Sequence, residues 1–316
     1  RVLVTGAGGS IGRELVDQIS ELDPAHLTLL DNSEYALFNV ERDLAKNAPG
    51  LAHSAVIADV RDQKKLARVF GGERPQLVFH AAALKHVPLV EENKLEGLAT
   101  NVLGSARVAD AARTAGVDTF VQISTDKAVN PASVMGASKR LAEMYCQALD
   151  RAAGPNAGTR FVTVRFGNVL GSTGSVVELF RDQLQAGGPL SVTHPDMTRY
   201  FMTVREAVEL VLQASAMGNE DPSGDGRIFV LDMGEPVRIM DLARQMIRLA
   251  GFDPDTEIGI EIIGARPGEK LFEEVLHGAE EHVPTGQEGL LLARPRTQDV
   301  AVLKERIEDL DRAILS

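Results

Sequence analysis

The chain has 316 residues, and with 44% hydrophobic and 25% charged residues it has the composition of an ordinary globular protein with enough length for a large core. Its 33 Lys and Arg residues against 45 Asp and Glu residues give a formal net charge of -12, which argues against a protein that grips nucleic acid through a basic face. The single cysteine, Cys146, excludes an internal disulfide, fits a reducing compartment and is expected as a small buried apolar residue.

Short apolar runs alternate with longer helical patterns in the first half of the chain, which predicts repeated βα units and a parallel sheet. The expected strands are Val2–Thr5, Leu27–Asp31, Ala55–Asp59, Leu77–Ala81 and Phe120–Ser124. The expected helices are Ser10–Leu22, Glu34–Lys46, Gln63–Phe70, Gly97–Ala115 and a long one from about Ser133 to Ala152. Right-handed crossovers between such units give an α/β fold, a Rossmann-type doubly wound parallel sheet.

The pattern becomes less regular after a Gly- and Pro-containing loop at Gly154–Gly158 and a further strand at Phe161–Arg165. Shorter elements follow, with a strand at Ile258–Ile263 and a closing helix at Val300–Leu315. We therefore expect a dinucleotide-binding domain with the catalytic loop over residues 1–168. Residues 169–316 are expected to form mainly a smaller C-terminal substrate-binding lobe, partly interleaved with the first domain.

A glycine-rich turn joins the first strand to the first helix and reads Thr-Gly-Ala-Gly-Gly-Ser-Ile-Gly over residues 5–12. Glycines in this context permit a tight turn, let the backbone approach a pyrophosphate and allow close helix–sheet packing. The pyrophosphate would lie at the helix N-terminus, where free N–H groups favour negative charge. The predicted cofactor-binding residues here are Gly6, Gly9, Ser10, Ile11 and Gly12.

Other candidate cofactor contacts lie at the ends of the next strands. Asp31 ends the second strand, where an acidic residue would bond the adenosine ribose hydroxyls and favour NAD over its phosphorylated form. Asp59 and Val60 could contact adenine, although Asp59 could equally cap the following helix. The remaining predicted contacts are the small residues Ala81, Ala82 and Ala83, together with Asn101 and Lys139.

Two polar segments follow the fifth strand, Ser124-Thr-Asp-Lys127 and Met135-Gly-Ala-Ser-Lys139. Open α/β sheets bind ligands at the carboxyl ends of their strands, which is where these segments are expected. By spacing alone, Asp126 and Lys127 could instead form a solvated ion pair on a loop.

Six stretches carry a more specific resemblance. They are residues 80–88 (HAAALKHVP), 124–129 (STDKAV), 134–140 (VMGASKR), 165–169 (RFGNV), 194–199 (HPDMTR) and 266–270 (RPGEK). On these motifs the chain resembles the extended short-chain dehydrogenase/reductase superfamily and, within it, the polysaccharide-biosynthesis UDP-N-acetylglucosamine 4,6-dehydratase family. The superfamily usually carries Tyr four residues before the catalytic Lys, whereas this chain has Met135 before Lys139. The membrane-linked branch of the dehydratases is similar in carrying Met there.

The resemblance implies a reaction in which C4 of a nucleotide sugar is oxidised, water leaves across C5–C6 and C6 is then reduced, with C5 retained. It implies catalytic roles for Thr125, Asp126, Lys127, Met135 and Lys139. Thr125 would bond the C4 oxygen, Asp126 would be the acid and Lys127 the base. Met135, whose thioether cannot exchange a proton, replaces the usual Tyr base. Lys139 would hold the nicotinamide ribose.

The same resemblance implies substrate contacts from Lys85, Asn168, Ser175, Arg199, Arg266 and Glu269. The arginines are suited to a diphosphate because a guanidinium pairs bidentately with its oxygens. Plainer roles remain open for each: surface ion pairs for Arg199 and Arg266, a loop or surface role for Asn168 and Lys85, and a helix cap for Glu269. His86 is expected to be structural.

Two alternative functions remain, a nucleotide-sugar 4-epimerase and a non-catalytic protein that binds NAD or a nucleotide sugar. No metal site is expected. The expected partners are a UDP-sugar and a second copy of the chain. The copies would form a dimer or higher oligomer through the helices after Gly97 and Ser133. Nucleic acid is not an expected partner. Because the chain opens with Arg1 inside a strand, we expect a preceding segment. By resemblance it would anchor the parent protein in a bacterial inner membrane, with this part on the cytoplasmic side.

Overall fold

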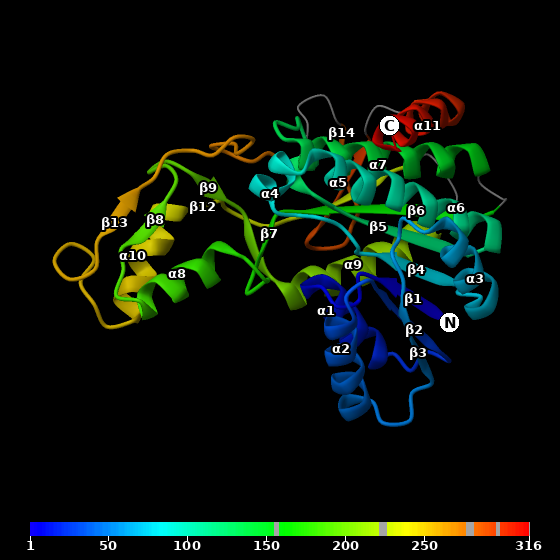
Figure 1. Ribbon diagram of the computed structural model, residues 1–316, viewed down its shortest axis with the longest axis horizontal. Coiled ribbons are helices and arrows are strands. Elements are labelled where there is room, and N and C mark those ends of the chain that lie inside the picture. The colour runs from blue at the N-terminus through cyan, green and yellow to red at the C-terminus, as the bar shows by residue number, and fades with distance from the viewer. Residues whose placement is uncertain (155–157, 221–225, 276–280, 295–297, 316) are drawn as a thin grey trace.

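A computed structural model describes residues 1–154, 158–220, 226–275, 281–294 and 298–315 of the chain. A large sheet forms the centre of the molecule, with helices on both faces and a smaller lobe at one end (Figure 1). No helix within these ranges is long and apolar enough to cross a membrane.

The central sheet has nine strands in the order β14-β15-β11-β6-β5-β4-β1-β2-β3. Strands β3 to β11 along this order are all parallel, and β15 and β14 are added antiparallel at one edge. The strands are β1 (Val2–Thr5), β2 (Leu27–Asp31), β3 (His53–Ile57), β4 (Leu77–His80), β5 (Thr119–Thr125), β6 (Arg160–Phe166), β11 (Ile228–Leu231), β14 (Glu281–Pro284) and β15 (Leu290–Arg294). The order 3-2-1-4-5-6 is that of a Rossmann sheet, so the predicted fold class is confirmed.

Helices cover both faces because the parallel strands are apolar on both sides. One face carries α1 (Ser10–Ser20), α2 (Glu34–Asn47) and α9 (Val204–Glu220). The other carries α3 (Gln63–Glu73), α6 (Ser105–Ala115), α7 (Val134–Ala153) and α11 (Val300–Leu315). Cys146 is buried in this second core, as expected.

The segment expected as one helix over Gly97–Ala115 is divided into three. A short helix α5 (Lys94–Leu98) leads into a π-helical segment η1 (Ala99–Gly104), and α6 follows. A second short helix, α4 (Val87–Glu92), precedes them. The expected strand at Ala55–Asp59 begins two residues earlier, as β3. Residues 155–157 of the expected loop at Gly154–Gly158 lie outside the described ranges.

The smaller lobe gathers short elements from the second half of the chain around their own core (Figure 1). It contains α8 (Val176–Gln185), β8 (Leu190–Val192), α10 (Ile239–Leu249) and β13 (Ile260–Ile262), with β13 parallel to β8. Two small strand pairs lie between this lobe and the sheet: β7 (Asn168–Leu170) with β10 (Phe201–Thr203), and β9 (Thr198–Arg199) with β12 (Val237–Arg238). A 3-10 turn, η2 (Asp126–Ala128), follows β5.

Helix α11 packs against α7 and η1. Leu303 is buried there, and Asp311 pairs with Arg107 at 2.7 Å. The end of the chain therefore covers part of the helical face that was expected to meet a second copy. The oligomeric state stays a prediction.

Candidate active site

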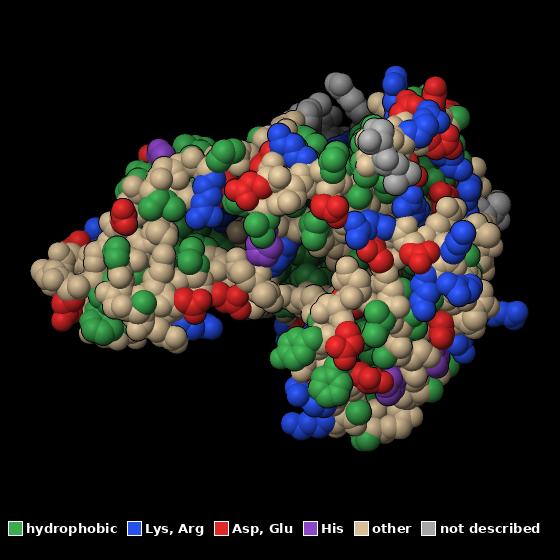
Figure 2. All heavy atoms as spheres, viewed as in Figure 1, with side chains coloured by type: hydrophobic (Ala, Val, Ile, Leu, Met, Phe, Trp, Pro, Cys, Tyr) green, Lys and Arg blue, Asp and Glu red, His purple; other side chains and the backbone are tan. Residues whose placement is uncertain are grey.

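A cavity of about 790 Å³ opens where the carboxyl ends of the parallel strands face the smaller lobe. Figure 2 shows the surface hollowed between these two parts. Strand ends from β1, β2, β4 and β5 line one side, and residues of α8, β8 and the segment around Arg266 line the other. This volume falls within the range of sites that bury a small organic ligand.

The glycine-rich turn forms one end of the cavity, and two of its glycines have no space for a side chain. Gly6 has φ +67°, and an added Cβ would lie 2.6 Å from the backbone nitrogen of Ala82. A Cβ on Gly12 would lie 1.9 Å from the carbonyl oxygen of Gly6. Helix α1 begins directly after this turn at Ser10, without a side-chain cap. Its first N–H groups are thus available at the wall of the cavity for an anionic group.

Asp31 and Asp59 both line the cavity, but they are held differently. The Asp31 carboxylate accepts hydrogen bonds from the backbone N–H groups of Gly8 (2.8 Å) and Ser33 (2.9 Å), which fixes it at the end of β2. Asp59 forms a salt bridge with Arg61 at 2.7 Å. The hydrogen bonds that the side chain and the backbone N–H of Arg61 donate to the Asp59 carboxylate lower the pKa of Asp59. The side chain that caps α3 is Asp62, so the alternative of Asp59 as the helix cap is wrong.

Val60 and the three alanines 81–83 line the cavity, as do Ser10 and Ile11, whereas Asn101 does not. Asn101 is fully buried in η1, where its amide bonds both backbone groups of Leu84 (2.8 and 2.9 Å) and the Ser138 hydroxyl (3.0 Å). In this conformation it holds the segment after β4 against α7, and direct cofactor contact by Asn101 stays a prediction.

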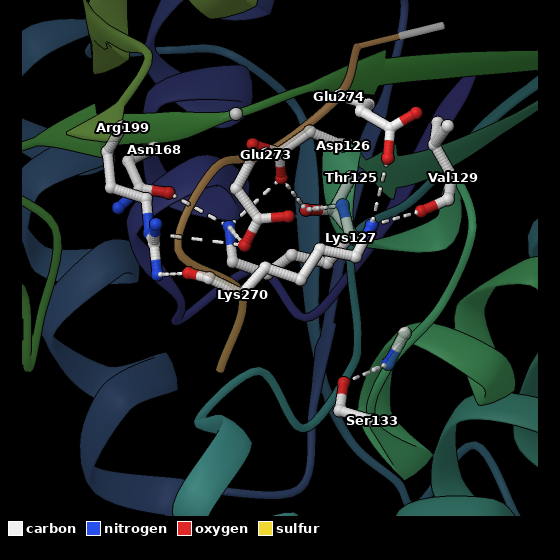
Figure 3. Close-up of polar contacts among 12 residues, drawn as sticks. Thr125, Asp126, Lys127, Val129, Ser133, Asn168, Arg199, Lys270, Glu273 and Glu274 are labelled. Carbon is white, nitrogen blue, oxygen red and sulfur yellow. Dashed lines mark hydrogen bonds and ion pairs between the residues drawn. The ribbon is translucent and has the colours of Figure 1, made fainter. Parts of the chain in front are cut away.

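Thr125, Asp126 and Lys127 form a connected cluster with Asn168 at the end of β5 (Figure 3). Asp126 Oδ1 accepts a hydrogen bond from Thr125 Oγ1 (2.8 Å) and one from Lys127 Nζ (3.0 Å). Lys127 Nζ also donates to Asn168 Oδ1 at 3.0 Å. Asp126 is fully buried, so the alternative of a solvated ion pair is wrong. Thr125, Lys127 and Asn168 line the cavity, while Asp126 lies behind them.

Met135 and Lys139 lie one helical turn apart on α7 and both line the cavity. The helix begins after Ser133, whose hydroxyl accepts a hydrogen bond from the backbone N–H of Gly136 at 3.0 Å. Lys139 is 6% exposed, and burial lowers its pKa to about 8, although Glu143 one turn further partly opposes this. An ammonium group with this environment is close to losing its proton near neutral pH.

The two candidate arginines are placed differently. The Arg199 guanidinium is 8% exposed and donates to three backbone carbonyls, those of Thr198 (2.7 Å), Lys270 (2.9 Å) and Leu271 (3.4 Å). It is therefore not a surface ion pair, and its donors already hold the 270–271 segment. Arg266 is exposed at the cavity wall, and its guanidinium has no partner among the described residues.

The other predicted substrate contacts also lie in the cavity wall. Ser175 caps α8, accepting from the N–H of Glu178, while the Glu178 carboxylate accepts from the N–H of Gly174 at 2.7 Å. Glu269 accepts from the N–H of Arg266 at 3.3 Å. Lys85 and His86 follow β4 and also line the cavity, with His86 beside Gly174.

Glu273 is a cavity residue that the sequence reasoning missed. Its side chain is 3% exposed, and its Oε1 lies 3.9 Å from both Lys127 Nζ and Arg199 Nε. Burial raises the pKa of Glu273, Lys127 lowers it in part, and the neighbouring Asp126 adds to the rise. It lies three residues beyond the recognised stretch that ends at Lys270. The next residue is also Glu, so the sequence did not indicate which of the two points inward.

Comparison with known proteins places the chain in a family. A family model described as "Polysaccharide biosynthesis protein" matches residues 2–295. The chain belongs to this family, and the resemblance seen in the motifs is confirmed.

Several relatives carry more specific names. The chain is 51% identical over 282 residues to the capsular polysaccharide biosynthesis protein CapD of Staphylococcus aureus, covering 89% of this chain and 46% of that protein. It is 34% identical to a UDP-N-acetylglucosamine 4,6-dehydratase (inverting) of Campylobacter jejuni, covering 89% and 79%. It is 36% identical to a UDP-glucose 4-epimerase of Rickettsia massiliae, covering 88% and 78%. The chain spans about half the length of the first curated relatives it matches.

Solved structures agree on the fold. The structure of Pen from Bacillus thuringiensis matches with a TM-score of 0.82 at 30% identity, covering 94% of this chain and 87% of that chain. DesIV, a dTDP-glucose 4,6-dehydratase from Streptomyces venezuelae solved with NAD bound, matches with a TM-score of 0.74 at 23% identity, covering 99% and 97%.

Proposed function

We propose that this chain is an NAD-dependent nucleotide-sugar 4,6-dehydratase that acts on UDP-N-acetylglucosamine with retention at C5. The observation that carries the proposal is the Thr125–Asp126–Lys127 cluster, with a thioether at Met135 where a proton-exchanging Tyr is usual. A reaction that eliminates water needs an acid and a base beside the sugar, and this cluster supplies both kinds of group.

The residues at the glycine-rich end fit NAD. The clashes that a Cβ would make with the backbone at Gly6 and Gly12 keep the turn before helix α1 tight, the N-terminus of α1 would receive the pyrophosphate, and Asp31 would bond the ribose hydroxyls. When bound, NAD would accept hydride from C4 and return it to C6. Lys139 would hold the nicotinamide ribose.

The protein groups would handle the protons. Lys127 would take the C5 proton, and Thr125 would bond the C4 oxygen. Asp126 lies behind the cavity wall and would act through the Thr125 hydroxyl that donates to it. As C4 is oxidised, Asp126 would take up the proton of the C4 hydroxyl by this route, and it would then supply that proton to the leaving hydroxyl. Lys127 would return its proton to C5 when C6 is reduced. The exposed guanidinium of Arg266 is suited to the diphosphate.

The runner-up is a nucleotide-sugar 4-epimerase, which the name of the Rickettsia relative favours. An epimerase returns a sugar of unchanged mass with C4 inverted, whereas a dehydratase returns a product that has lost one water. A non-catalytic binding protein would return the sugar unchanged.

The test is incubation of the purified chain with UDP-N-acetylglucosamine, without and with added NAD, followed by mass spectrometry and proton NMR. Loss of one water, a C6 methyl signal and no net reduction of NAD are expected, and the C5 couplings report retention. Lys127→Met should bind NAD but not form product, and the exposed Lys64→Met serves as the matched control. Unchanged sugar with NAD bound would refute the proposal.

A further inference from the structure

Glu273 lies inside the cavity with little to compensate a negative charge. Figure 3 shows its carboxyl group near both Lys127 and Arg199, which come from η2 after β5 and from β9. Both nitrogen–oxygen distances are 3.9 Å, too long for hydrogen bonds. The second carboxyl oxygen, Oε2, is buried and has no hydrogen-bond partner among the described residues.

The two neighbouring cations direct their hydrogen bonds elsewhere. Lys127 donates to Asp126 and Asn168, both at 3.0 Å. Arg199 donates to backbone carbonyls at 2.7, 2.9 and 3.4 Å. A carboxylate in this position would lose its hydration without gaining the charge-assisted hydrogen bonds that offset the loss.

The charged groups that face Glu273 come from three segments: Asp126 and Lys127 from the end of β5, Arg199 from β9, and Lys270 from its own segment. Lys127 already donates a hydrogen bond to a carboxyl oxygen of Asp126. Burial is the largest contribution to the raised pKa of Glu273, and the cations only partly reverse it.

We propose that Glu273 binds the substrate as a neutral carboxylic acid, donating its O–H to an acceptor oxygen on the sugar. This inference rests on the proposed function, because it takes the ligand of the cavity to be a nucleotide sugar. The sugar is the expected source of the acceptor because Glu273 lies beside Lys127 and Asn168, at the proposed reacting end. Neither carboxyl oxygen of Glu273 has a hydrogen-bond partner among the described residues, Oε2 is buried, and the side chain lines the cavity, so the bound ligand completes the hydrogen bond from the other oxygen, Oε1.

The consequence is that binding takes up a proton wherever Glu273 is ionised in the free protein. Protonated Glu273 binds the ligand, so affinity is constant below its pKa in the free protein and falls by up to about tenfold per pH unit above it. Glu273→Gln keeps an N–H donor and cannot titrate. Its affinity is therefore expected to stay flat where that of the wild type falls.

The experiment measures the Kd of UDP-N-acetylglucosamine by calorimetry from about pH 5 to about pH 9. The protein is loaded with NADH, which cannot accept hydride, so turnover does not interfere. Lys139, with a pKa of about 8, changes the Kd with pH equally in the wild type and in Glu273→Gln, so its contribution cancels when the two pH profiles are compared. Glu274→Gln is the matched control, since Glu274 is exposed, bonds Asn130 and lies outside the cavity wall. It should follow the wild type.

Glu273→Ala removes the donor and should weaken binding by about fivefold at low pH, the size of one net hydrogen bond. The same titrations with UDP, which lacks the sugar, identify the acceptor. The Kd of UDP is measured for the wild type and for Glu273→Gln, and their difference is followed with pH. A pH-dependent difference only with the sugar attached supports the sugar oxygen, and the same difference with UDP overturns that assignment in favour of the diphosphate.

Identical pH profiles for wild type and Glu273→Gln would overturn the inference while leaving the dehydratase proposal standing. So would a Glu273→Gln variant as weak as Glu273→Ala at every pH, because that result means the anion is required. If the wild type binds NADH but no UDP-N-acetylglucosamine at any pH, the substrate assignment fails and the inference fails with it.

Discussion

Replacing Lys139 by methionine should make the protein more stable while abolishing its proposed activity. Lys139 is buried at the cavity wall, and no hydrogen bond of its ammonium group is found among the described residues. Methionine has a similar length and no charge, so it fills the space without the cost of burying an ammonium group. A residue retained at a cost to stability is expected where its charge serves the bound ligand.

The size of the effect follows from the pKa. Burial lowers the pKa of Lys139 from 10.5 to about 8, and each pH unit of difference corresponds to about 1.4 kcal/mol. The charged form of Lys139 therefore costs about 3 kcal/mol at neutral pH. Changed packing around the methionine should remove about 1 kcal/mol of the gain. The expected net stabilisation is about 2 kcal/mol.

The assay is urea unfolding followed by circular dichroism, since the chain has no Trp, without added cofactor and over a range from about pH 6 to about pH 10. Between the folded-state pKa of about 8 and the unfolded value of 10.5, the unfolded wild-type chain binds more protons at Lys139. The contribution of Lys139 to the wild-type free energy of unfolding therefore rises with pH, and the difference in stability between Lys139→Met and the wild type becomes smaller. Lys64→Met, on an exposed position of α3, should show neither effect.

Two results would refute this reasoning. A Lys139→Met protein less stable than the wild type at pH 7 would mean that the ammonium group is compensated in the folded state. An advantage that does not change between about pH 8 and about pH 10 would mean that its origin is packing rather than charge.

Three further predictions concern the interior. Glu143→Gln should lower the free energy of unfolding by about 3 kcal/mol in urea titrations, because it weakens the 2.8 Å pair with the buried Arg165; a loss below about 1 kcal/mol would contradict this. Gly6→Ala should abolish NAD binding in calorimetry, since its Cβ would lie 2.6 Å from the Ala82 nitrogen; wild-type affinity would show that the turn can shift. Burial lowers the pKa of His80 to about 3, so its NMR signals should stay constant from about pH 5 to about pH 8; a midpoint near 6.5 would place it in contact with water.

Local sequence patterns were sufficient for the first βα unit. The strand Val2–Thr5, the glycine turn and the helix from Ser10 follow from residues adjacent in the chain, because turn geometry and capping are set within a few positions. The alternation of strands and helices also predicted the parallel sheet, since crossovers have one hand. The break of the expected 97–115 helix into α5, η1 and α6 was not predicted, because helical periodicity hardly distinguishes a π-helical turn from an α-helix.

The sequence by itself determined the family, the Rossmann-type sheet, and the positions of Thr125 and Lys127 at a strand end and of Met135 and Lys139 on the helix that follows, since motifs and spacing carry that information. Only the tertiary structure decided which polar groups are left over once the chain has folded. In the folded chain, the Arg199 guanidinium donates its hydrogen bonds to backbone carbonyls, and the Glu273 carboxyl group is buried without a hydrogen bond. These outcomes depend on contacts between segments about 70 to 150 residues apart, where hydrogen-bond partners are chosen by packing and not by spacing along the chain.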